Sequence, residues 1–126
     1  MSTVAMILSF VLALVFLGSG AVKFSGTEMA AGAPEHLGVT PGTYKLAGVL
    51  ELLAAVGLVL AAIGVVSTSL GAAAAFGLTL LMAFAVGIHL RVGDPFSPAG
   101  AEPGAAWAPA ATLLLLSALT GVLILA

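Results

Sequence analysis

Four long apolar stretches constrain this chain more than any other feature of its sequence. A helix that crosses the hydrocarbon core of a bilayer needs about 20 predominantly apolar residues. Four segments meet that requirement, and the first and the last of them carry no charged side chain. They are residues 3–22, 44–63, 68–91 and 107–126. The sequence therefore predicts an all-α fold, an integral membrane four-helix bundle in which residues 1–126 form a single domain.

The composition excludes a water-soluble domain and narrows the possible chemistry. Hydrophobic residues make up 62% of the chain and charged residues 6%, whereas soluble domains carry about 25% charged residues. With a net charge of −2 and no basic patch, nucleic acid is not an expected partner. The lack of cysteine removes thiolate chemistry, disulfide exchange and iron–sulfur ligation. With only two histidines besides, we expect no metal ligands and no intrinsic cofactor.

The connections between the apolar stretches differ in length and character. Residues 24–43 are predicted to be a long polar loop, and residues 64–67 a tight turn. Residues 92–106 are rich in proline and glycine, which argues against a continuous helix there. Thr40 followed by Pro41 is typical of a helix start, with threonine as the N-cap and proline in the first turn.

The basic residues all lie at one end of the predicted bundle. With four spans, residues 24–43 and 92–106 share one side of the membrane, and Lys23, Lys45 and Arg91 border them. The positive-inside rule assigns this side to the cytoplasm. We expect the protein to be a multi-pass protein of a bacterial-type plasma membrane. Aromatic side chains at the same end suit the lipid–water interface. They are Phe24, Tyr44 and Trp107.

Glu51 is an acidic residue placed inside a predicted span, within the run KLAGVLELLAAVGLVL of residues 45–60. At 1.5 Å per residue it lies about 10 Å inside its helix. A charge at the middle of a span costs about 2.5–3.5 kcal/mol on insertion scales. We therefore expect Glu51 to face the bundle interior, and to have a cationic partner or carry a proton. Lys23, His89 and Arg91 are the candidate partners at a suitable depth.

Two interpretations of this polar group are open. In one, Glu51 forms a structural ion pair with Lys23 or Arg91 that only fixes the register of the helices. In the other, the group is a functional site in which Glu51 and His89 are the catalytic acid and base. Side chains at the same membrane level would then bind the ligand. They are Lys23, Tyr44, Arg91, Asp94 and Trp107.

Other ionisable residues are expected to lie outside this group. Asp94 followed by Pro95 is typical of a helix stop, although Asp94 could reach the same cluster. The remaining residues of this kind are predicted to be solvated loop residues. They are Glu28, Glu35, His36 and Glu102.

Several motifs, in this order and spacing, resemble the DoxX-like family of small four-helix membrane proteins. They are FLGSGAVKF (16–24), GVLELLAAVGLVL (48–60) and LMAFAVGIHLRVGD (81–94), followed by a proline-containing apolar last helix. The resemblance implies a four-helix membrane fold. The family's named member is similar to the small membrane subunit of a thiosulfate:quinone oxidoreductase, and other members resemble assembly partners. The resemblance implies no general catalytic role for the polar positions.

Three functions follow as hypotheses. The first is a polar intramembrane site for a lipid-soluble, quinone-like molecule, with any electrons supplied by a partner protein. The second is a stand-alone acid–base enzyme, of isomerase or hydrolase type, that uses Glu51 and His89 on an apolar substrate. The third is an assembly or chaperone partner of another membrane protein, or a homo-oligomer. It predicts that Gly71→Leu, on an outward face of small residues, is more harmful than Glu51→Gln.

Overall fold

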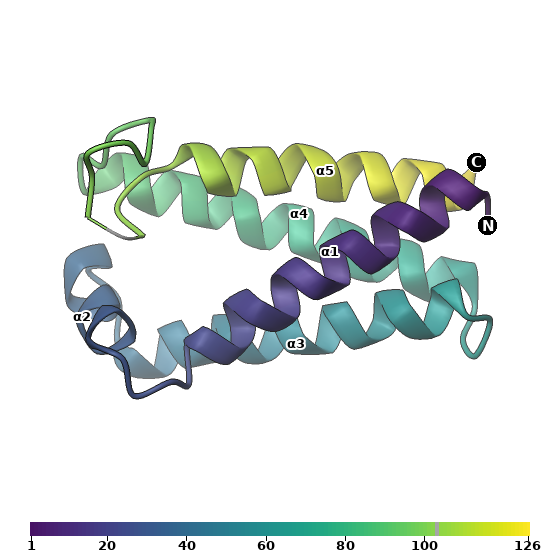
Figure 1. The fold of residues 1–126 in the computed structure, drawn as a ribbon, viewed down its shortest axis with the longest axis horizontal. Coiled ribbons are helices and arrows are strands. Elements are labelled where there is room, and N and C mark those ends of the chain that lie inside the picture. The colour runs from purple at the N-terminus through teal and green to yellow at the C-terminus, as the bar shows by residue number, and fades with distance from the viewer. Residues whose placement is uncertain (103) are drawn as a thin grey trace.

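The computed structural model describes residues 1–102 and 104–126, and the regular structure in these residues is entirely helical (Figure 1). Four of the helices are long and apolar enough to cross a membrane, which confirms the predicted membrane helical bundle. Their bounds lie within a few residues of the expected ones. The helices are α1 (Thr3–Val22), α2 (Glu28–Leu37), α3 (Pro41–Ala62), α4 (Thr68–Arg91) and α5 (Ala108–Leu125).

The expectation of a loop over residues 24–43 is wrong, because α2 occupies its centre. The Thr27 side chain accepts a hydrogen bond from the backbone of Ala30 and so caps the start of the helix. Gly38 ends it in the left-handed conformation, with φ of 70°, and Val39 N–H donates back to the Pro34 carbonyl. This polar ten-residue helix is too short to span, and local capping defines both of its ends.

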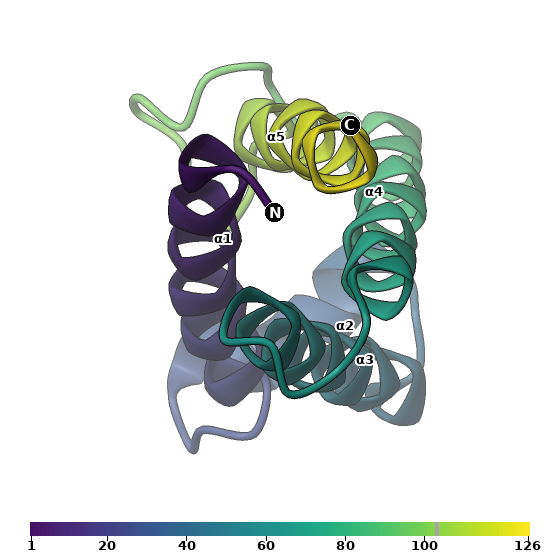
Figure 2. The same ribbon diagram turned by 90° about the vertical axis from the view of Figure 1, so that its right-hand side faces the viewer.

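The four long helices form a ring in which each packs against two neighbours (Figure 2). Going round the ring, the order is α1, α3, α4, α5, so α1 lies across from α4. Both chain termini lie at one end of the bundle, and α2 lies at the other end together with the segment between α4 and α5 (Figure 1). The segments that directly follow α1 and α4 therefore lie together at the end that carries α2.

The interior is filled by large side chains and small ones in alternation. Leu12, Phe16, Leu58 and Leu78 are the largest apolar side chains that are fully buried. The outer surface is equally apolar, with Leu14 74% exposed. An apolar exterior is the pattern expected in lipid, where acyl chains solvate such side chains and helix association depends on close packing.

Helices α1 and α3 pack closely where they cross. A Cβ atom added at Gly20 would lie 2.9 Å from the Gly48 carbonyl oxygen, and one added at Gly48 would lie 3.1 Å from the Gly20 carbonyl oxygen. Only glycine at both positions lets the two backbones approach this closely.

A second close contact, between Gly71 of α4 and Ala61 of α3, bears on the proposed Gly71→Leu test. A Cβ atom added at Gly71 would lie 2.5 Å from the Cβ of Ala61, because Gly71 is buried where α4 meets α3. The expectation that Gly71 lies on an outward face is therefore wrong. Gly71→Leu would disrupt the packing of the bundle itself and would not report on a partner protein.

The segment between α4 and α5 closes on itself with backbone hydrogen bonds. Trp107 N–H donates to the Pro95 carbonyl, and Ala108 N–H donates to the Phe96 carbonyl. The Phe96 and Trp107 rings pack edge to face, with centroids 4.8 Å apart. The indole thus lies against its own loop at the end of the bundle that carries α2.

Candidate functional site

Glu51 is buried in the bundle and forms an ion pair with Lys23. The Lys23 Nζ atom lies 2.8 Å from Glu51 Oε1, and the Glu51 residue is 1% exposed. The pair joins the end of α1 to α3 and lies beside the contact between Gly20 and Gly48. The prediction that Glu51 faces inward and meets a cation is confirmed. Its role as a catalytic residue stays a prediction.

The ammonium group of Lys23 has further partners. It donates to Ser19 Oγ at 3.1 Å and to the Ser19 carbonyl oxygen at 3.4 Å, and it lies 5.4 Å from the centroid of the Tyr44 ring. An ammonium group has three hydrogens to donate, so Glu51 and Ser19 occupy all of them. The contact with the Ser19 carbonyl is the longest and therefore the easiest to exchange.

One oxygen of this buried pair lacks a partner. Glu51 Oε2 is fully buried and makes no hydrogen bond with any described residue. A buried carboxylate oxygen without a donor costs about 1–3 kcal/mol. Such a group is satisfied by a donor from elsewhere, such as water or a ligand, or by carrying a proton.

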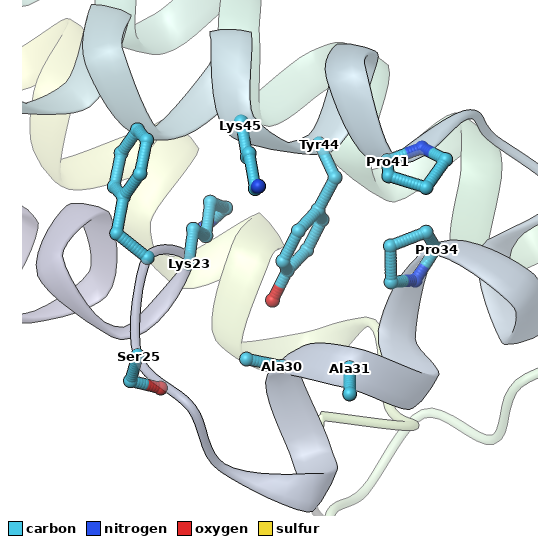
Figure 3. A pocket seen from close by; sticks show the side chains of 9 residues that line it. Lys23, Ser25, Ala30, Ala31, Pro34, Pro41, Tyr44 and Lys45 are labelled. Carbon is cyan, nitrogen blue, oxygen red and sulfur yellow. The ribbon is translucent and has the colours of Figure 1, made fainter.

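Beside the pair lies a cleft of about 260 Å³ (Figure 3). Three parts of the chain form its walls: the end of α1 with the residues that follow it, helix α2, and the first turn of α3. Tyr44 crosses the cleft from α3 with its hydroxyl group directed toward Ala30 of α2. Lys23 and Lys45 provide its cationic groups. In the described part of the chain, no hydrogen bond engages the Tyr44 hydroxyl and no acid pairs with Lys45.

A second polar cluster lies at the same end of the bundle, around Asp94. His36 Nε2 lies 2.7 Å from Asp94 Oδ1, and His89 Nδ1 contacts Asp94 Oδ2. Since a carboxylate only accepts hydrogen bonds, each contacting imidazole nitrogen carries a hydrogen. The Asp94 side chain is 4% exposed, whereas that of His36 is 45% exposed. The His36–Asp94–His89 cluster therefore joins α2 to the end of α4.

The backbone turn after α4 places Asp94 next to His89. Gly93 adopts φ of 80°, Gly93 N–H donates to the Leu90 carbonyl and Asp94 N–H donates to the His89 carbonyl. This is a Schellman motif, which folds the chain back over the last helical turn. The expected helix stop at Asp94 and Pro95 is confirmed, and the turn brings the Asp94 carboxylate onto the imidazole of His89.

The charge state of Asp94 follows from its neighbours. Burial raises the pKa of the Asp94 carboxyl group, but the hydrogen bonds from His89 and His36, and their charges, outweigh it. The pKa of Asp94 therefore lies below its ordinary value of 3.8. Asp94 is ionised at neutral pH and holds both imidazoles as donors.

Arg91 contributes a second link between α4 and α2. Its Nη2 atom donates to the Leu37 carbonyl oxygen at 3.1 Å. A cation at this point also interacts favourably with the negative end of the α2 helix dipole. Arg91 is therefore engaged at the membrane surface and makes no ion pair with Glu51 in the described residues.

The structure separates the predicted site residues into two groups. Lys23, Tyr44 and Glu51 come together, as the sequence predicts. His89 does not join them: among the described residues no hydrogen bond or ion pair links His89 to Glu51, and its partner is Asp94. The expected dyad of Glu51 and His89 is thus not formed. Trp107 packs against Phe96 and does not line the cleft.

Sequence reasoning missed His36, which was expected to be a solvated loop residue. It lies near the end of α2, where the turn at Gly38 closes the helix. The cluster around Asp94 is not a metal site in this geometry, because its imidazoles contact opposite carboxylate oxygens and do not converge on one point. Within the described ranges, no group of three or more His, Cys, Asp or Glu side chains could hold a metal ion.

Comparison with known proteins agrees with this architecture. A family model described as the DoxX-like family matches residues 7–120, which is most of the chain. Searches of curated proteins and of solved structures found no match to the sequence. The family match covers α3 and α4 entirely, together with the Lys23–Glu51 pair and the Asp94 cluster. The chain therefore belongs to the DoxX-like family, as its motifs predict.

Proposed function

We propose that this integral membrane protein binds the head group of a lipid-soluble, quinone-like molecule in the cleft beside Lys23 and Tyr44. The observation that carries the proposal is the pairing of a cleft residue with a buried acid. Lys23 lines the cleft, and its ammonium group is bonded to Glu51, whose second oxygen has no partner in the described residues. A molecule in the cleft would thus contact a donor that is coupled to a buried proton acceptor.

The volume of the cleft indicates that it would hold only the head group of the ligand. Sites that enclose a drug-sized ligand have volumes of roughly 300–1,000 Å³, and this cleft measures about 260 Å³. It suits a single substituted ring whose apolar tail stays among the acyl chains. Phe24 and Tyr44 offer aromatic surface to such a ring.

The polar atoms of the cleft suit a carbonyl oxygen. The Tyr44 hydroxyl has no hydrogen-bond partner in the described part of the chain, and Lys23 could exchange its long contact with the Ser19 carbonyl for a ligand oxygen. Reduction of a quinone consumes two electrons and two protons. For each of the two protons, the Lys23 ammonium could give a hydrogen to the ligand oxygen and regain one taken up from water by Glu51, while the two electrons would come from a partner membrane protein.

A second hollow in the structure is a poorer candidate for the head group. A groove of about 370 Å³ lies between α3 and α4, and the described residues that line it are all apolar, from Leu50 and Ala54 to Leu81 and Phe84. It offers no donor that would orient a carbonyl group. An acyl chain of the surrounding lipid fits it without further recognition.

The acid–base enzyme hypothesis is less well supported. It needs an acid and a base that act on one substrate, and it assigned these roles to Glu51 and His89. In the structure each has a different partner, Lys23 for Glu51 and Asp94 for His89. We also propose that the end with α2 faces the cytoplasm, because Lys23, Lys45 and Arg91 all border it.

The test is equilibrium binding of decyl-benzoquinone to the protein in lipid nanodiscs, measured by titration calorimetry. Tyr44→Phe removes one hydroxyl donor and should weaken binding by about 3- to 10-fold, as expected for one hydrogen bond. Thr112→Val is the matched control, because its hydroxyl lies near the same end, donates to the Ala108 carbonyl and does not line the cleft.

Two outcomes would count against the proposal. One is binding by the wild-type protein that is no tighter than partition into empty nanodiscs. The other is saturable binding that Tyr44→Phe leaves unchanged, because the head group would then lie outside the cleft. Decane in place of the quinone shows whether the ring is needed.

A further inference from the structure

Helix α2 forms one wall of the cleft, and it takes no part in the extensive helix–helix packing of the described residues. Ala30, Ala31 and Pro34 of α2 line the cleft opposite Tyr44 and Lys45 of α3 (Figure 3). The four extensive helix–helix contacts in the described residues all join membrane-spanning helices, and none involves α2. A wall that lies outside the packing of the four spans depends on specific side-chain contacts to keep its position.

In the described residues, the side-chain hydrogen bonds and ion pairs that join α2 to a spanning helix come from the end of α4. Asp94 binds His36, and the same carboxylate is held from the other side by His89. Three residues earlier, Arg91 donates to the Leu37 carbonyl at the end of α2. Both links reach the last turn of α2 and leave its first turn to local capping by Thr27. We call Arg91, Asp94 and His89 of the α4 end, together with His36 of α2, the latch.

The chain on both sides of α2 is able to bend. Gly26 precedes the helix, and no atom of the described residues lies within 4 Å of a Cβ that would be added there. Gly38 follows the helix with φ of 70°, a conformation that favours glycine. Lids that close over sites commonly rotate about a few such residues at the ends of an element.

We infer that α2 is a lid over the cleft, and that the latch at the end of α4 controls access of a ligand to Lys23 and Tyr44. The latch closes the lid when the Asp94 carboxylate binds His36 and Arg91 binds the α2 carboxyl end. Loss of either link lets α2 swing away about Gly26 and Gly38 while the four spans stay packed. As regulation of the cleft, this inference rests on the proposed function, but its structural content is independent of any ligand.

The natural absence of cysteine allows the lid to be tested with single thiols. Ala30 is 6% exposed in the closed cleft, so Ala30→Cys should react slowly with a water-soluble maleimide when no ligand is present. Adding Asp94→Asn or His36→Leu should raise the labelling rate by about tenfold, the factor expected from loss of one charge-assisted hydrogen bond. His36→Leu covers the case in which Asp94→Asn does not fold, since the His36 side chain is 45% exposed.

Two control thiols separate lid opening from other changes. Ser69→Cys is exposed near the opposite end of α4 and should react at the same rate in every background. Ala75→Cys is 0% exposed in the bundle and should stay unreactive. The inference is overturned if neither latch variant accelerates labelling of Ala30→Cys, or if Ala75→Cys reacts in parallel, because opening is then global. Faster labelling without quinone binding by the wild type would reject the proposed ligand and leave the lid standing.

Discussion

The Lys23–Glu51 pair and the His36–Asp94–His89 cluster lie at the same end of the bundle but in different surroundings. The first joins two spans that pack closely, and its carboxylate is 1% exposed. The second joins a surface helix to the end of a span, and one of its imidazoles is 45% exposed. In lipid a charge has no substitute partner, whereas water can replace a lost contact at the surface. We therefore expect the inner ion pair to stay formed while the bundle is folded, and the outer cluster to be able to open.

Removing the cation of the inner pair should have the largest effect on stability. Lys23→Met leaves the Glu51 carboxylate buried without a partner, which should lower the free energy of unfolding by about 3–5 kcal/mol. Unfolding by SDS in mixed micelles, followed by far-UV circular dichroism, measures this loss. Lys45→Met is the matched control. It removes an exposed lysine of the same cleft and should change stability by less than about 0.5 kcal/mol.

The double variant Lys23→Met with Glu51→Leu sharpens the interpretation. It removes both charges and should recover most of the loss, because an apolar pair is tolerated where a single buried charge is not. A double variant as unstable as Lys23→Met alone would mean that lost packing, and not the unpaired carboxylate, causes the effect.

The glycine contact beside the inner pair should give the next largest effect. In Gly20→Ala the new Cβ would lie 2.9 Å from the Gly48 carbonyl, so α1 must move away from α3 at a cost of about 1–3 kcal/mol. Gly18→Ala is the control on the same helix, since nothing lies within 4 Å of its Cβ. The same micelle unfolding assay compares the two. Equal stability of both variants would show that the helices do not depend on this crossing.

The outer cluster should respond to acid. Because the folded-state pKa of Asp94 lies below 3.8, its ionised form stabilises the folded protein at higher pH. That contribution is complete above pH 3.8 and is lost as the pH falls through the lowered folded-state pKa. We expect amide protection in α2 to fall with it, by about 1 kcal/mol for the loss of the charge-assisted bonds. Hydrogen exchange measured across this range, with Asp94→Asn as the reference, isolates the response of the carboxyl group.

The aromatic contact of the α4–α5 segment should give the smallest effect. Phe96 packs edge to face on Trp107 but is itself 60% exposed. Phe96→Ala should therefore reduce stability by only about 0.5 kcal/mol, the lower end of the range for an aromatic pair, and should leave the quinone affinity unchanged because neither ring lines the cleft. A variant that loses affinity without losing stability would connect this segment to the ligand.

The sequence was sufficient to predict the spans and the inner pair for one physical reason. Lipid offers no hydrogen bonds, so long apolar runs must be helical and Glu51 must find a partner inside the bundle. Which cation pairs with Glu51 depends on which helices are neighbours in the ring. The order of the helices cannot be predicted from the sequence, because the spans carry apolar residues on all of their faces. Lys23 is the partner because α1 packs directly on α3.

The outer cluster could not be predicted, because it depends on a helix with little apolar signal of its own. Once α2 is missed, His36 has no defined position and Asp94 has only a local role. The contact between Asp94 and His89 could nevertheless have been predicted from the sequence. Glycine just beyond the end of α4 is typical of a Schellman turn, and that turn alone brings Asp94 back to His89.

The order of the paired residues along the chain has a consequence for biogenesis. A ribosome delivers Lys23 before Glu51, so the acid can meet its counter-ion as soon as the second membrane-spanning helix leaves the translocon. The latch cannot assemble until Asp94 has been synthesised, some forty residues later. The nascent protein thus neutralises its one deep carboxylate early, and it closes the lid only after the third membrane-spanning helix is complete.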